Sequence, residues 1–179
     1  MKRSVCLLLT LVVLLIMSSC DRDQRKAKNW NDKTLADLDA IKFIRGGITG
    51  GLMEIKAANL AKTRSSNPRV INFANMMIAD HTQIGNELKK MESDKMLDKD
   101  KNLISDEHQS MLSELAAKSG SAFDKAYMGM MVSDHQEDIE LFNSATHNTS
   151  ATIQKLAEKT LPTLQMHLDS AKAINASLK

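Results

Sequence analysis

The feature that most constrains the fold of this chain is a helical spacing of apolar residues that recurs in four long segments. In each segment the apolar residues return every three or four positions, the period of one helix face, and strand-type alternation is absent. Only two prolines and seven glycines occur in 179 residues, so few positions interrupt a helix. The expected long helices cover residues 34–64, 68–93, 121–146 and 151–175.

Local signals indicate where these helices begin and end. Asn67 followed by Pro68 matches an N-cap with proline at the first helical position. The segment SAFD that begins at Ser121 resembles a capping box with Asp in place of Glu. Pro162 lies inside the last helical pattern, so we expect a kink there or a restart after Thr160.

The connections between the four helices are short, long and short. The long connection, residues 94–120, carries a short helix of its own that starts at Ser105. This connectivity predicts an all-α, ferritin-like four-helix bundle whose long crossover carries a short extra helix between helices two and three. A crossover that runs the length of the bundle makes helices two and three parallel. A simple up-and-down bundle is the alternative.

The first residues predict export and lipid attachment. Lys2 and Arg3 precede an apolar run of 12 residues, which is short for a membrane span and typical of an export signal. The run ends in MSSC, which resembles a bacterial lipobox with Cys20 as the lipidated residue. We therefore expect a lipoprotein signal peptide at 1–19, a lipidated cysteine and polar tether at 20–33, and the bundle at 34–179. An ordinary signal peptide or an anchor helix is the alternative.

Composition excludes several classes of function. Without Lys2 and Arg3 the chain keeps 22 basic and 22 acidic residues, and it has one Trp, one Tyr and four Phe. A nucleic-acid partner is not expected, because neither a basic face nor a set of stacking rings is visible. Removal of Cys6 and acylation of Cys20 leave no free thiol. With no nucleophile motif or phosphate loop, we expect no catalytic residues, and an enzyme is the less favoured interpretation.

A repeated hexapeptide supplies the candidate site. The segment MMIADH at 76–81 returns as MMVSDH at 130–135. On a helix, His81 and His135 each lie on the apolar inner face of their segment. If the two helices are parallel, both histidines lie at nearly the same depth in the bundle. Glu54 on helix one and His167 on helix four lie near that level. The pattern predicts a metal site of Glu54, His81, His135 and His167 that holds iron, zinc or copper.

A structural interpretation stands beside this one. Methionines on an apolar face usually fill a core, and buried histidines often only satisfy neighbouring polar groups. On that reading the protein is a structural or partner-binding helical module with no metal and no catalysis, whose protein partner is unknown. The glycine pairs Gly46-Gly47 and Gly50-Gly51 lie in one helix, where they cost stability, so close approach of another helix or a ligand is expected.

Three segments resemble a known family. They are FANMMIADHTQIGNELKKM, FDKAYMGMMVSDHQEDIELF and TLPTLQMHLDSAKAI, and together they resemble the domain-of-unknown-function 4142 family over residues 35–174. The resemblance implies a ferritin-like bundle in the bacterial cell envelope, with the outer membrane favoured and the domain in the periplasm, and it implies no established reaction. The positions that match the family are Glu54, Asp80, His81, Phe123, Asp124, Tyr127, His135, Leu161, Pro162 and His167. We expect Asp80, Asp134 and Tyr127 to support the metal ligands.

The chain departs from ferritins themselves at one motif. Three positions before His81 stands Ile78, and three before His167 stands Leu164, where a di-iron site has glutamate. A mononuclear, imidazole-rich site is therefore expected in place of a carboxylate-bridged di-iron centre. The Met-His pairs, together with the similar helices of a copper-associated family, keep copper among the candidates.

Overall fold

The computed structural model describes residues 38–95, 97 and 104–178, and every regular element in those residues is a helix. The predicted signal peptide and tether lie outside the described residues. The expected all-α class is confirmed, and within the described residues no helix is long and apolar enough to cross a membrane. The helices are α2 (Leu38–Arg64), α3 (Pro68–Asp94), α4 (Asp106–Ala116), α5 (Gly120–Ala145) and α6 (Ala151–Ser177).

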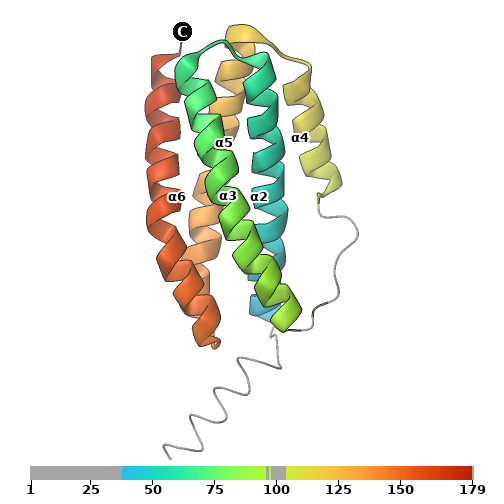
Figure 1. Ribbon diagram of the computed structural model, residues 1–179, viewed down its shortest axis with the longest axis vertical. Coiled ribbons are helices and arrows are strands. Elements are labelled where there is room, and N and C mark those ends of the chain that lie inside the picture. The colour runs from blue at the N-terminus through green and yellow to red at the C-terminus, as the bar shows by residue number, and fades with distance from the viewer. Residues whose placement is uncertain (1–37, 96, 98–103, 179) are drawn as a thin grey trace, which may run out of the picture.

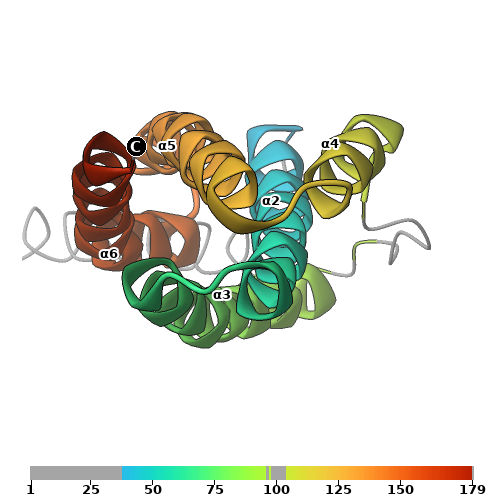
Figure 2. The same cartoon turned by 90° about the horizontal axis from the view of Figure 1, so that it is seen from above.

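Four long helices form the bundle, and the short α4 packs on its outside (Figure 1). The hairpin of α2 and α3 packs against the hairpin of α5 and α6, so that α2 contacts α3 and α5, and α6 contacts the same two helices. Seen along the bundle, α3 and α5 lie diagonally opposite each other (Figure 2), and both run downward in Figure 1. The expectation of parallel helices two and three is confirmed, and the up-and-down alternative is wrong.

Two of the expected helix starts are observed with their capping bonds. Asn67 accepts a hydrogen bond from the Arg69 backbone at 3.0 Å, directly before Pro68. Ser105 accepts one from the His108 backbone at 3.1 Å and begins α4. These side chains satisfy donors that the first turn of a helix leaves free.

The expected capping box at Ser121 is wrong. The helix α5 already begins at Gly120, and Ser119 occupies the N-cap position without a side-chain capping bond. Gly120 has a φ of +57°, a conformation that costs glycine little, so the chain turns into the helix before Ser121 is reached.

The last helix continues through its proline. Because α6 runs without interruption from Ala151 to Ser177, the expected restart after Thr160 is wrong. Pro162 removes the hydrogen bond that the carbonyl of Glu158 would receive. Glu158 is an exposed residue, so water can replace the missing donor.

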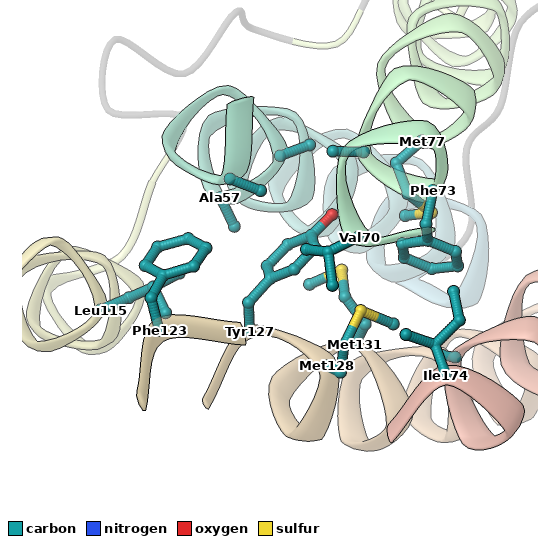
Figure 3. Packing of buried hydrophobic residues seen from close by; sticks show 14 of the residues in the cluster. Ala57, Val70, Phe73, Met77, Leu115, Phe123, Tyr127, Met128, Met131 and Ile174 are labelled. Atoms are coloured by element: carbon teal, nitrogen blue, oxygen red, sulfur yellow. The ribbon is translucent and has the colours of Figure 1, made fainter. Parts of the chain in front are cut away.

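The apolar interior consists of two clusters separated by a polar layer. One cluster contains Phe73, Met77, Tyr127 and Met131 and is shown in Figure 3. The other contains residues such as Leu88 and lies toward the opposite end of the bundle. Each long helix passes from one cluster to the other, and near the boundary each carries one buried polar side chain. These four side chains are Glu54, His81, His135 and His167.

Candidate metal centre

Each of the four long helices contributes one of the sequence-predicted ligands to the polar layer. Glu54 comes from α2, His81 from α3, His135 from α5 and His167 from α6, and their exposed fractions are 1%, 3%, 0% and 0%. The three histidines form one group of potential ligands, and Glu54 lies beside them in a second group with His81. One ring nitrogen from each histidine lies within 4.8 Å of the other two.

Glu54 lies between two of the imidazole rings. Its Oε2 is 2.9 Å from His81 Nδ1, and its Oε1 is 3.1 Å from His135 Nδ1. Both oxygens are buried without a hydrogen bond of good geometry. Burial raises the pKa of Glu54 to about 8, although the Asp138 carboxyl acts in the opposite direction. A carboxylate in this position needs a cation or a proton beside it.

The orientation of His135 follows from its contact with the backbone. His135 Nδ1 lies 2.9 Å from the carbonyl oxygen of Met131. A carbonyl oxygen only accepts, so Nδ1 carries the proton and donates it to this bond. In the neutral ring, Nε2 is then an unprotonated nitrogen with a free lone pair. Burial lowers the pKa of His135 to about 3, which keeps the ring neutral near pH 7.

His167 faces this lone pair. Its Nδ1 lies 3.2 Å from His135 Nε2, and its Nε2 lies 2.9 Å from Asp80 Oδ2. If His167 Nε2 donates to Asp80, the neutral ring directs a second lone pair at His135. Burial lowers the pKa of His167 and disfavours the doubly protonated ring that would donate at both nitrogens.

His81 supplies a third nitrogen of the same kind. Its Nδ1 faces Glu54, whereas its Nε2 is buried without a hydrogen-bond partner. Burial lowers the pKa of His81 as well, against the opposing charges of Asp138 and Asp80. Each histidine thus has one nitrogen beside an oxygen atom and one nitrogen free for another ligand. Metal-binding histidines typically show this arrangement, in which the outer nitrogen is held by a carboxylate or a carbonyl.

The distances between the rings fit a metal ion. The ring centroids of His81, His135 and His167 are separated by 5.2, 5.3 and 5.4 Å. A tetrahedral ion with metal–nitrogen bonds of about 2.0–2.1 Å holds its ligand nitrogens about 3.3 Å apart and the ring centres about 5.2 Å apart. The triangle of rings therefore has the dimensions of a three-histidine site.

Among the expected supporting residues, Asp80 alone contacts a histidine directly. It contacts His167 across the α3–α6 interface and not the adjacent His81. Asp134, the matching aspartate of the second copy, is partly buried, and one of its carboxylate oxygens has no partner. Burial and the nearby charges of Glu54 and Asp138 raise the pKa of Asp134 to about 8.

Tyr127 belongs to the apolar cluster. It stacks on Phe123 with ring centroids 5.9 Å apart and packs edge-on against Phe73 at 6.2 Å. Its hydroxyl group points away from α5 (Figure 3), is buried and has no hydrogen-bond partner. Burial and the charge of Glu54 raise its pKa. Tyr127 thus lies near the polar layer without a direct contact to the histidines in the structure.

The second methionine of each copy of the repeat lies in the core, whereas Met76 and Met130 are partly buried and pack against it. Met77 and Met131 are fully buried in the apolar cluster together with Phe73 (Figure 3). These two methionines fill the core, as the structural interpretation expects. The histidines one turn further along each helix lie in the polar layer.

One residue of the polar layer was not anticipated. Asp138 offers an oxygen within 4.8 Å of ligand atoms from Glu54 and His81. It lies three positions after His135 on α5, and residues three apart share one face of a helix. The sequence spacing could therefore have indicated Asp138.

The chain belongs to the family described as "Domain of unknown function (DUF4142)", whose model matches residues 24–174. The resemblance of the three quoted segments is confirmed by this match. Comparison with curated proteins found no match, and comparison with solved structures found none either.

Proposed function

We propose that this member of the DUF4142 family binds a transition-metal ion between His81, His135 and His167. The observation that carries the proposal is the 3.2 Å contact between His135 Nε2 and His167 Nδ1. The other nitrogen of each ring faces an oxygen acceptor, so two lone pairs face each other inside the protein when both rings are neutral. A cation between them removes this repulsion.

The competing occupant of this position is a proton on His167. With this proton, His167 would donate hydrogen bonds to both His135 and Asp80. The polar layer would then be a hydrogen-bonded network with a purely structural role. Such a proton leaves His81 Nε2 without a partner and places a charged ring in a site with no exposure. A metal ion satisfies all three free nitrogens at once, which favours metal binding.

The donor set favours zinc, copper or iron(II). Imidazole nitrogens suit all three ions, and no thiolate belongs to the cluster. Three histidines leave a further coordination position, with the Glu54 carboxyl between two of the ligand rings. We infer that the protein acts in metal handling or in metal-linked stress protection in the cell envelope.

The proposed location is a bacterial membrane, with the outer membrane favoured and the bundle in the periplasm. Support comes from the sequence alone, namely the positive residues, the apolar run and the lipobox-like MSSC that ends at Cys20. Several acyl chains on one cysteine would hold the protein stably on the membrane.

Elemental analysis of protein purified without an affinity tag tests the proposal. We expect at least one metal ion per chain, lost when His135 and His167 are both replaced by alanine. His147→Ala is the matched control, because His147 is exposed and contacts Thr146 instead of the cluster. A folded wild-type protein that holds no metal, even after dialysis against zinc, copper or iron(II), would contradict the proposal.

A further inference from the structure

A second group of potential ligands adjoins the three-histidine site. It consists of Glu54, His81 and Asp138, each of which offers one ligand atom within 4.8 Å of the others. The two groups share His81. Its Nε2 is the free nitrogen of the first site, and its Nδ1 lies 2.9 Å from Glu54 Oε2.

The second group lies beside two glycines of α2. A Cβ atom at Gly50 would lie 3.4 Å from Asp138 Oδ1, and one at Gly51 would lie 3.5 Å from His81 Nδ1. Both glycines precede Glu54 by one helical turn, so they share its face of α2, and a Cβ atom at either position would be in ordinary van der Waals contact with the ligand atom. The other glycine pair serves close packing instead. A Cβ atom at Gly46 would meet the Leu141 side chain, and one at Gly47 would meet the Leu88 side chain.

The Glu54 carboxylate of the second group lacks the well-formed hydrogen bonds that burial demands. Both carboxylate oxygens of Glu54 are buried without a hydrogen bond of good geometry. Burial, together with the neighbouring Glu54 charge, raises the pKa of Asp138 well above its ordinary value. Two adjoining carboxyl groups in an apolar bundle are stabilised by a shared proton or by a cation between them.

A groove reaches one member of this group, His81. It has a volume of about 200 Å³, lies between α2 and α3, and is lined by Gly51, His81 and Gly85 among others. A Cβ atom at Gly85 would meet nothing within 4 Å, so packing does not account for glycine at that position. The groove offers a small hydrated cation a route to the His81 ring.

We propose that Glu54, Asp138 and His81 Nδ1 hold a second divalent cation, and that the His81 ring bridges it to the ion in the three-histidine site. The inference rests on the proposed function, since the bridge requires the first ion. Two carboxylates and one imidazole suit zinc, copper(II), iron(II) or manganese(II). The 2.9 Å between Glu54 Oε2 and His81 Nδ1 equals the spacing of adjacent donors about 2.1 Å from one ion.

The bridge has a defined proton balance. A ring that binds one metal ion through each nitrogen carries no N–H, so the second ion displaces the remaining ring proton of His81 to solvent. The two ions would lie about 6 Å apart, as two metal–nitrogen bonds of about 2.0–2.1 Å on opposite sides of one ring require.

Metal titration of the full mature protein tests the second site. Protein stripped with a chelator is titrated with Zn²⁺ in a calorimeter, and we expect two equivalents for the wild type and one for Asp138→Asn. Glu140→Gln is the matched control, because Glu140 is an exposed acidic residue of the same helix, and it should keep two equivalents. Circular dichroism checks that each variant is folded.

The outcomes separate this inference from the proposed function. One equivalent in both the wild type and Asp138→Asn would overturn the second site and leave the three-histidine site intact. No binding by the wild type would overturn both. Two equivalents in Asp138→Asn would show that the second ion binds elsewhere.

Copper provides a readout that a merely structural carboxylate cluster would not affect. In the stripped protein, the first equivalent of Cu²⁺ should give its full electron paramagnetic resonance intensity. The second equivalent should lower the total intensity, because the deprotonated His81 ring couples the two unpaired electrons. A signal that simply doubles would overturn the bridging role of His81.

Discussion

Asp80 contacts His167, 87 positions away on α6, and not His81, which follows it directly in the chain. The two residues of this Asp-His pair thus serve different imidazole rings of one layer. His81 presents its own nitrogen to the candidate site, while Asp80 holds the outer nitrogen of His167. In the second copy of the hexapeptide, Asp134 makes no such contact, so the two copies are alike in their histidines and different in their aspartates.

Asp80→Ala should weaken metal binding without removing a ligand. Loss of the oxygen that holds His167 Nε2 frees the ring to rotate, and such a change typically costs about 10–100-fold in affinity. Competition with a chromophoric chelator measures the effect. Asp134→Ala provides the comparison, because no histidine contact depends on it, and an equal loss in both variants would contradict the assigned role of Asp80.

Leu88→Ala should cost about 2–5 kcal/mol of unfolding free energy, as expected for a fully buried leucine. A Cβ atom at Gly47 would lie 2.7 Å from Leu88 Cδ1, so Gly47→Ala alone should also destabilise the protein. In the double variant the new methyl group occupies part of the cavity, and the combined cost should be smaller than the sum. Urea unfolding measures all three variants. Strict additivity would show that the two positions do not share the cavity.

The stability of metal-free protein should depend on pH in two opposing ways. His135 has a folded-state pKa lowered from 6.5 to about 3, so its contribution is lost as pH falls below 6.5. Glu54 has a folded-state pKa raised from 4.5 to about 8, so its contribution is lost as pH rises above 4.5. Together they predict greatest stability between pH 4.5 and 6.5, and a decline toward pH 8.

The Glu54→Gln variant isolates the alkaline part of this profile. An amide does not ionise, so the decline toward pH 8 should become shallower, with the raised pKa of Asp134 as a remaining contribution. Urea midpoints measured from pH 4 to 9 check the expectation. An unchanged decline in the variant would mean that Glu54 is not the group that ionises.

Lipid attachment is tested at Cys20. The wild type should incorporate labelled fatty acid and remain with the membrane fraction, whereas Cys20→Ala should stay unprocessed or become soluble. Cys6→Ala is the control, because Cys6 lies in the segment expected to be removed. Equal labelling of Cys20→Ala and the wild type would exclude the lipobox interpretation.

The sequence by itself determined the helices and the inward face of each. Helical period, short loops and the caps at Asn67 and Ser105 are local signals, and the structure follows them. The long connection predicts parallel helices two and three, which in turn predicts that His81 and His135 lie at one depth. A period of about 3.6 residues per turn suffices for this level of detail, because it decides which side of a helix each residue occupies.

Only the tertiary structure decided which side chains meet. The period does not specify the rotation and axial shift of neighbouring helices to the ångström, and hydrogen bonds depend on shifts of that size. The pairing of Asp80 with His167, the inclusion of Asp138, and the position of Glu54 between two rings all arise from that packing. The start of α5 at Gly120 likewise depends on a backbone angle that a capping pattern does not reveal.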